Sequence, residues 1–257
     1  MSVSLAACAE MVFTDLPIVE RVKQIDAQGF LVEIWSWQNK DLKALAATGA
    51  RFSSMTGYLR GDLIDPEGAV EVVRTAAESI TAAKELGITR LVVHPAELID
   101  GKAARPRRRS DGRMWLTAMH ALEQLGELGA RHGVTFCLEN LNTVLDHPGV
   151  PLARAKDTLA LVEAVAHPNV KMMLDLYHQQ LGEGNLIAML ERAGEAIGEV
   201  QVADVPGRCE PGTGEINYAA VAVALRRIGY TGTVGLEAWA AGDSNAALTA
   251  FRAAFTG

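Results

Sequence analysis

Four oxygen-bearing side chains, three carboxylates and one amide, lie at or near the ends of short apolar runs in the second half of the sequence. They are Glu139, Asp175, Gln201 and Glu237. Their separations are 36 residues (139 to 175), 26 residues (175 to 201) and 36 residues (201 to 237). These lengths suit consecutive strand-plus-helix units. We therefore expect the four side chains to converge above four neighbouring parallel strands.

Three carboxylates at one point repel each other unless a counter-charge is present. At 4 Å a pair costs about 1 kcal/mol in water and roughly four times that at an effective dielectric constant near 20. A divalent cation removes this cost, and oxygen ligands without Cys or an obligatory His favour Mg²⁺ or Mn²⁺ over Zn²⁺. The four side chains thus predict a divalent metal site. The alternative is that each acid caps a helix or pairs with an arginine in its own loop.

Two further polar residues lie close in sequence to this quartet. His178 follows Asp175 by three residues and could donate a hydrogen bond to a substrate oxygen. Arg208 lies in the Pro/Gly-containing turn 204–208, where a rigidly held guanidinium suits bidentate capture of a carboxylate or of vicinal oxygens. The alternatives are a structural histidine and a solvated loop arginine.

The elements that must position these residues are short apolar runs alternating with longer stretches of helical period. Mostly continuous apolar runs are typical of parallel strands covered on both faces. The expected strands are 3–8, 31–35, 52–56, 90–94, 134–139, 170–175, 199–203 and 234–237. The expected helices are 16–28, 41–47, 69–86, 115–132, 157–165, 185–193, 218–228 and 245–255.

Eight strands alternating with eight helices predict an α/β fold, a single (β/α)₈ TIM barrel spanning residues 1–257. Gly29, Gly87, Gly133 and Gly229 each follow a predicted helix and suit its left-handed terminus. The active site is then expected at the C-terminal ends of strands five to eight. The competing open nucleotide-binding sheet would need a G-x-G-x-x-G turn after an early strand, and residues 9–11 read AEM instead.

Composition bounds the remaining classes of protein. The 257 residues are 49% hydrophobic with a formal net charge of −7, which excludes a disordered chain and disfavours a nucleic-acid partner. Charges interrupt every apolar stretch before the roughly 20 residues needed to cross a bilayer, so no membrane partner is expected. The three unpaired cysteines (Cys8, Cys137 and Cys209) and the lack of a targeting signal favour a cytoplasmic protein.

Two other features invite a functional interpretation. Trp35 and Trp239 follow the second and eighth strands and could form an apolar wall of the site, with core packing as the alternative. The cluster Arg105, Arg107, Arg108 and Arg109 lies in a long loop after the fourth strand. We expect it either to attract an anionic substrate, to contact a neighbouring subunit, or to be a solvated loop. A homo-oligomer is therefore one of the possibilities.

Several motifs resemble those of the hydroxypyruvate isomerase family, within the xylose-isomerase-like barrels. The segment 203–218 (ADVPGRCEPGTGEINY) is similar to the family's hallmark, and 138–149 (LENLNTVLDHPG), 173–178 (MLDLYH) and 235–237 (GLE) match its other motifs. The resemblance covers residues 130–240. In the N-terminal half it extends only to the order of elements and to the strand end at His94.

This resemblance implies a metal held by Glu139, Asp175, Gln201 and Glu237. It also implies substrate contacts, which we assign to His178, Arg208 and His94. Gln201 stands where related ketose 3-epimerases carry a histidine, which favours the isomerase branch. Those epimerases also place a second glutamate six residues after the first, where this chain has Leu145 beside Asp146.

The function expected is therefore a metal-dependent aldose–ketose isomerase using Mg²⁺ or Mn²⁺. Its substrate would be a small hydroxy-oxo acid, such as hydroxypyruvate or a 2-oxo-tetronate, or a short sugar. Glu139 and Glu237 would be the catalytic acid/base pair, acting through an enediolate. A ketose 3-epimerase and a non-catalytic sugar-acid-binding protein remain alternatives. A DNA-repair endonuclease of the wider family is disfavoured by the acidic charge and the six scattered histidines.

Overall fold

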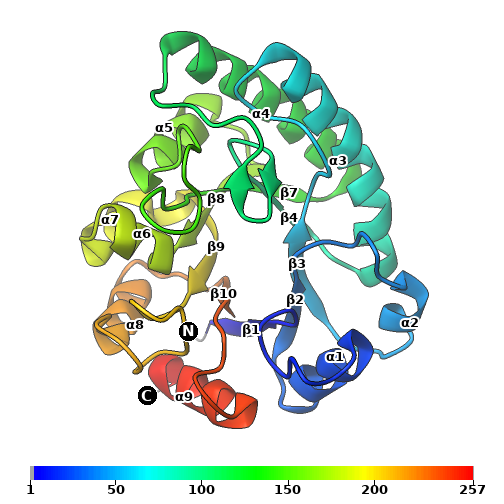
Figure 1. Cartoon of the computed structure of the whole chain (residues 1–257), viewed down its shortest axis with the longest axis vertical. Helices are drawn as coiled ribbons and strands as arrows, with labels where there is room; N and C mark the ends of the chain where they lie inside the picture. Colours follow the sequence, from blue (N-terminus) through cyan, green and yellow to red (C-terminus); the bar gives the residue numbers. More distant parts are fainter. Residues whose placement is uncertain (1–2, 257) are drawn as a thin grey trace.

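Eight parallel strands close into a barrel in the computed structural model, which describes residues 3–256. The order around the barrel is β1-β10-β9-β8-β7-β4-β3-β2, with every neighbouring pair parallel (Figure 1). The predicted TIM barrel is thus confirmed. The barrel strands are β1 (Ser4–Cys8), β2 (Leu31–Ile34), β3 (Phe52–Thr56), β4 (Arg90–Val93), β7 (Thr135–Glu139), β8 (Val170–Asp175), β9 (Ile197–Val202) and β10 (Thr233–Leu236).

Helices surround the strands on the outside (Figure 1). They are α1 (Ile18–Ala27), α2 (Leu42–Ala46), α3 (Pro66–Leu86), α4 (Gly112–His132), α5 (Ala155–Val165), α6 (Leu176–Gly182), α7 (Leu186–Ala193), α8 (Tyr218–Arg227) and α9 (Ser244–Thr256), with a 3₁₀ turn at Gly194–Ala196. Gly87 and Gly133 end α3 and α4 in the left-handed conformation, as predicted. An alanine there would carry a Cβ into a region that L-residues disfavour.

The long helices α3 and α4 each begin three residues earlier than predicted, and the reason is their N-caps. The Asp65 side chain accepts a hydrogen bond from Gly68 N, and the Asp111 side chain accepts one from Met114 N. Aspartate at this position pairs an otherwise unbonded amide of the first turn. The apolar period that we used for prediction starts only inside each helix, so it missed this first turn.

A helix and a hairpin between the barrel strands were not predicted. Helix α6 follows β8 without a loop, because Asp175 is both the last residue of the strand and the N-cap of the helix. A short antiparallel hairpin, β5 (Leu98–Ile99) with β6 (Lys102–Ala103), lies in the long loop after β4. Both additions are at the C-terminal side of the barrel, where they add residues to the site described below.

The ring of helices closes where the chain's last helix meets its first. Phe251 of α9 stacks on Phe30, which precedes β2, with ring centroids 5.8 Å apart, and Gln28 donates a hydrogen bond to Asn245 at 3.0 Å. All three cysteines are free, and Cys8 and Cys137 are buried. Across residues 3–256, every helix is too short or too polar to serve as a transmembrane segment.

Candidate active site at the C-terminal end of the barrel

The four residues predicted from the strand ends lie together at one end of the barrel. Glu139 ends β7, Asp175 ends β8, Gln201 lies in β9 and Glu237 directly follows β10, and Asp175 pairs with Gln201 in the register of the sheet. Ligand atoms of Glu139, Asp175, Glu237 and the nearby His178 all lie within 4.8 Å of one another. Gln201, Glu139 and Glu237 line a cavity of about 560 Å³.

The crowding of buried acids raises the pKa values of Glu139 and Asp175. Burial raises the pKa of Glu139 well above its usual range, the Glu237 carboxylate raises it further, and the Arg208 guanidinium opposes both. Burial and then the charge of Glu139 raise the pKa of Asp175 in the same way. The Oε1 atom of Gln201 is buried and has no hydrogen-bond partner among the described residues. Three carboxylates and one unpartnered carbonyl oxygen are the donor set that Mg²⁺ and Mn²⁺ prefer.

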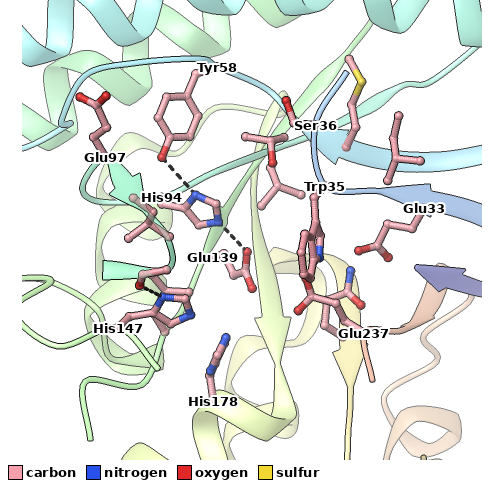
Figure 2. A pocket seen from close by; sticks show the side chains of 18 of the residues that line it. Glu33, Trp35, Ser36, Tyr58, His94, Glu97, Glu139, His147, His178 and Glu237 are labelled. Atoms are coloured by element: carbon pink, nitrogen blue, oxygen red, sulfur yellow. Dashed lines mark hydrogen bonds and ion pairs between the residues drawn. The ribbon is translucent and has the colours of Figure 1, made fainter. Parts of the chain in front are cut away.

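His94 contacts Glu139 at the wall of the cavity, as Figure 2 shows. The Nε2 atom of His94 lies 3.0 Å from Oε2 of Glu139, and its Nδ1 atom lies 3.1 Å from the Tyr58 hydroxyl. Burial lowers the pKa of His94 to about 4, so at neutral pH the ring carries one proton. An ionised Glu139 accepts that proton from Nε2, and Nδ1 faces the Tyr58 hydroxyl, which donates to the carbonyl oxygen of Ala96 at 3.2 Å. His94 therefore contacts an acid of the cluster directly.

The proton position on His178 follows from its neighbour Asn142. The Asn142 Oδ1 atom accepts hydrogen bonds from the amides of Leu145 and Asp146, so its Nδ2 atom is the one facing His178 Nδ1, at 2.7 Å. Because Nδ2 can only donate, Nδ1 of His178 must be the acceptor. The neutral ring then carries its proton on Nε2, which lies 3.8 Å from Asp175 Oδ2. His178 thus presents an N–H donor, and not a lone pair, to the cluster.

Glu237 and Arg208 form the opposite wall of the cluster. The Nη2 atom of Arg208 lies 2.5 Å from Oε2 of Glu237, and its Nη1 atom lies 3.7 Å from Asp146. The guanidinium also lies over the Tyr177 ring, 4.9 Å from its centroid. The other oxygen of Glu237 accepts a hydrogen bond from Trp35 Nε1 at 2.7 Å. Arg208 is therefore held by acids and an aromatic face within reach of the cavity.

The other predicted features have different placements. Trp35 lines the cavity, and Trp239 packs edge-on against it with ring centroids 6.2 Å apart. Arg105 pairs with Asp62 at 2.9 Å and with Asp65 at 3.0 Å, beside the start of α3. Its charge is thus matched by acids of the neighbouring loop.

The sequence analysis did not single out Glu33, Tyr58 and His147, which line the cavity, or Asn142, which contacts His178. Glu33 is the single charged residue of β2 and is 4% exposed, and a charge inside a buried strand is a signal that could have found it. Asn142 and His147 lie in the quoted segment 138–149. His147 donates to the carbonyl of Gly101 at 2.6 Å, and its ring lies 4.9 Å from that of His178. The histidines are scattered in the sequence, and His147 meets His178 only because the loop after β7 folds back onto α6.

Known proteins resemble the chain over most of its length. It is 28% identical over 240 residues to a 2-oxo-tetronate isomerase of Pectobacterium atrosepticum, with 90% of each chain covered. It is 29% identical over 252 residues to a putative hydroxypyruvate isomerase of Streptomyces coelicolor, covering 88% of this chain and 87% of the relative. A crystal structure described as an AP endonuclease, family 2, from Brucella melitensis superposes with a TM-score of 0.83 at 27% identity, covering 97% and 98% of the two chains. The model of the Xylose isomerase-like TIM barrel family matches residues 8–254, and the chain belongs to that family.

Proposed function

We propose that this protein is a metal-dependent isomerase that interconverts the aldose and ketose forms of a small hydroxy-oxo acid or short sugar. The observation that carries the proposal is the meeting of Glu139, Asp175 and Glu237 within 4.8 Å, at a cavity that Gln201, with its unpartnered carbonyl oxygen, also lines. Curated relatives named as 2-oxo-tetronate and hydroxypyruvate isomerases support the same reaction class.

Glu139, Asp175, Gln201 and Glu237 would hold the metal, Mg²⁺ or Mn²⁺. When bound, such a cation supplies a Lewis acid for the substrate's carbonyl and neighbouring hydroxyl oxygens, and it offsets the repulsion among the three acids. The residues fit this group, because burial makes the uncompensated carboxylates costly and because Gln201 leaves one oxygen free.

Glu139 and Glu237 would transfer the proton between adjacent carbons of the substrate. They approach the cavity from different sides, Glu139 through His94 and Glu237 through Trp35 and Arg208 (Figure 2). One removes the proton from the hydroxyl-bearing carbon, leaving an enediolate, and the other delivers a proton to the neighbouring carbon. The proton of the original hydroxyl passes to the former carbonyl oxygen, so the new carbonyl and the new hydroxyl form together. Each positioned acid or base of this kind contributes about 10²–10⁴-fold. Burial raises the pKa of Glu139 in the metal-free protein, and this would partly offset the lowering that a bound cation causes.

Arg208 and His178 would orient the substrate for this transfer. The guanidinium of Arg208 can bind a carboxylate through two parallel hydrogen bonds, and the buried Nε2–H of His178 can donate to a substrate oxygen. Among the cavity-lining residues that the structure describes, Arg208 is the one Arg or Lys. A substrate with a single carboxylate, such as a 2-oxo-tetronate or hydroxypyruvate, matches that one guanidinium.

The experiment is a substrate panel of hydroxypyruvate, 2-oxo-tetronates and short ketoses, run in deuterated water with Mg²⁺, with Mn²⁺ and with chelator. We expect isomerised product carrying solvent deuterium, lost on chelation and lowered at least 100-fold in Glu139→Gln and in Glu237→Gln. Unchanged turnover after chelation and in Glu237→Gln would refute the proposal. A product that keeps its carbonyl position would indicate a ketose 3-epimerase. Tight binding without deuterium incorporation would indicate a sugar-acid-binding protein.

A further inference from the structure

His147 is a buried histidine of the cavity wall that the proposed reaction does not use. It lies in the loop after β7 with 8% of its surface exposed, and it lines the same cavity as Glu139 and Glu237. Its ring packs edge-on against that of His178, with centroids 4.9 Å apart and an interplanar angle of 73°. The two histidines, both labelled in Figure 2, therefore form one continuous part of the cavity wall.

The turn of the β5–β6 hairpin presents a carbonyl group to His147. Asp100 and Gly101 form this two-residue turn, and both have positive φ (48° and 76°), as a common hairpin turn of this length requires. The carbonyl oxygen of Gly101 lies 2.6 Å from Nδ1 of His147. Apolar residues of the hairpin and of the loop after β7, Ala103 and Val150 among them, pack together in a separate hydrophobic cluster. The turn and the ring are thus held against each other.

The Gly101 carbonyl determines which nitrogen of His147 carries the proton. Burial lowers the pKa of His147 to about 4, so at neutral pH its ring carries one proton. A carbonyl oxygen only accepts hydrogen bonds, so that proton lies on Nδ1 and Nε2 carries a lone pair. Nε2 makes no hydrogen bond with residues 3–256 and is not one of their enclosed unpartnered atoms, so its lone pair is open to the cavity. Figure 2 shows this nitrogen on the side of the ring turned toward His178.

The neighbouring His178 has the opposite proton position. Its Nδ1 atom accepts a hydrogen bond from Asn142, so its Nε2 atom carries the hydrogen. The backbone carbonyl of the same Asn142 accepts a hydrogen bond from the His147 amide at 3.0 Å, so one residue positions both histidines. The pair presents one donor and one acceptor side by side. A hydroxyl group can satisfy both, whereas a carbonyl or carboxylate oxygen would leave the acceptor of His147 unpaired.

The two histidines lie at the edge of the acidic cluster. An atom of His178 belongs to the group of possible ligands that lie within 4.8 Å of one another, whereas His147 belongs to no group of this kind among residues 3–256. A substrate oxygen that contacts both rings is therefore on the outer side of the oxygens that the metal site would bind.

The oxygens of the candidate substrates can be assigned to partners in turn. The carboxylate matches Arg208, and the carbonyl and its neighbouring hydroxyl oxygen belong to the metal site. Hydroxypyruvate then has no oxygen left for the two histidines. A 2-oxo-tetronate has one more oxygen, the hydroxyl on C4, and a hydroxyl is the group that the two rings together select.

We propose that His147 is a substrate-binding residue that accepts a hydrogen bond from the C4 hydroxyl of a 2-oxo acid, while His178 donates a hydrogen bond to the same oxygen. The role rests on the proposed function. It narrows the substrate class from hydroxy-oxo acids in general to those of at least four carbons that carry a hydroxyl on C4.

The test compares 2-oxo-tetronate with its 4-deoxy analogue, which has the same carbon chain and the same configuration at C3 but lacks the C4 hydroxyl. Both compounds carry every group that the isomerisation itself needs. Because the analogue leaves the buried acceptor of His147 and the donor of His178 unpaired, we expect wild-type kcat/KM to be about 10- to 100-fold higher for 2-oxo-tetronate. Equal values for the two compounds would overturn the role.

Two variants of His147 separate substrate binding from a role in holding the hairpin. His147→Phe keeps an aromatic ring against His178 but has no acceptor, and we expect the ratio of the two kcat/KM values to fall about 10-fold. His147→Gln keeps a donor for the Gly101 carbonyl and an accepting oxygen, and we expect its ratio to stay within about threefold of the wild type. If His147 only held the hairpin, His147→Phe would lower kcat/KM for both compounds equally, and the unchanged ratio would overturn the proposed role.

His120→Phe is the matched control. His120 lies on the outer helix α4, is exposed, and contacts Glu123 at 3.0 Å. We expect this change to alter neither kcat/KM value. Thermal melting of each variant verifies folding, and the wild-type ratio and the NMR measurement described next decide the question if His147→Phe does not fold.

Nitrogen-15 NMR of the histidine rings tests the proton position without turnover. In the substrate-free protein we expect His147 to show a protonated Nδ1 and an unprotonated Nε2, the reverse of His178. The signals of His147 are identified by their loss in His147→Gln. A proton on Nε2 of His147 would overturn the role, because the ring would then offer no acceptor to the substrate. A wild-type protein that isomerises neither 2-oxo-tetronate nor any other compound of the panel would instead refute the proposed function itself.

Discussion

The indole nitrogen of Trp35 donates a hydrogen bond to Oε1 of Glu237 at 2.7 Å, joining the end of β2 to the end of β10. Arg208 occupies the other oxygen of the same carboxylate. The Trp35 ring is itself braced edge-on by Trp239 at an interplanar angle of 90°. A carboxylate oxygen has more than one acceptor direction, so these two donors fix the plane of Glu237 and still leave lone pairs for a cation or proton.

Replacing Trp35 by Phe removes this donor and keeps an aromatic wall. A hydrogen bond to a charged group contributes about 1.5–3 kcal/mol, so we expect kcat to fall about 10- to 100-fold with folding retained. Trp37→Phe is the control, because the Trp37 indole binds Ser79 at 3.1 Å, away from the cavity. Steady-state kinetics on the active substrate measure both variants. Equal kcat values for the two would show that Trp35 does not orient the acid.

The fold could be predicted because the signals that mark strands and helix ends depend only on residues close together in the sequence. Continuous apolar runs mark strands that are buried on both faces, and glycines such as Gly87 and Gly133 mark helix ends through their left-handed backbone. The ends of parallel strands all face one side of the barrel, so the meeting of Glu139 with Asp175 and Glu237 followed from the predicted topology alone.

The partners of these acids could not be predicted in the same way. His94 meets Glu139 across 45 residues, and Trp35 meets Glu237 across 202 residues, through side-chain directions that no periodicity encodes. Glu33 was missed because β2 was recognised by its apolar residues, and the one charged residue within it was not considered separately. Helix α6 was missed because no loop separates it from β8. Asp175 is the last residue of the strand, the N-cap of the helix and a member of the acidic cluster.

Glu199 makes the stability of the metal-free protein depend on pH. Burial raises its pKa to about 7, against the opposing effects of Arg90 and Ser54. Since the pKa in the folded state is above that of an unfolded glutamate, Glu199 contributes most to stability at low pH. That contribution is lost as pH rises from about 4.5 to about 7.

We therefore expect Glu199→Gln to gain stability relative to the wild type between pH 5 and pH 8, by up to about 3 kcal/mol. Urea unfolding in the presence of chelator at the two pH values measures this difference. Glu195→Gln, a change at an exposed glutamate on the 3₁₀ turn before β9, is the control and should show no such trend. A constant difference between wild type and Glu199→Gln at both pH values would contradict the raised pKa.

Arg208→Lys retains the charge but loses the planar fork. If Arg208 binds a substrate carboxylate through two hydrogen bonds, KM for a hydroxy-oxo acid should rise about 10- to 100-fold. KM for a neutral short ketose should change little, and the ratio of the two KM values is the measurement. Arg192→Lys, at an exposed arginine paired with Glu163, is the matched control. An equal rise for both substrates would assign Arg208 to holding Glu237 alone.

Asn142→Asp should invert the proton position on His178. The substitution keeps an oxygen for the amides of Leu145 and Asp146, but it places an acceptor where Nδ2 now donates to His178 Nδ1. The ring proton then moves to Nδ1, and Nε2 faces the cluster with a lone pair instead of a hydrogen. Because a substrate oxygen loses its donor, we expect kcat/KM to fall about 100-fold or more, or about 3 kcal/mol.

Nitrogen-15 NMR of the His178 ring reads the change directly, since protonated and unprotonated ring nitrogens are distinguishable. Asn217→Asp, the same change at the N-cap of α8, should leave both spectrum and rate unchanged, because aspartate caps a helix as well as asparagine does. Asn142 also donates to Asp146 at 2.6 Å, so the new acid adds a repulsion there. The double variant Asn142→Asp/Asp146→Asn removes that repulsion but not the new acceptor, and its rate should stay low. Recovery of the rate in the double variant would mean that repulsion, and not the position of the His178 proton, caused the loss.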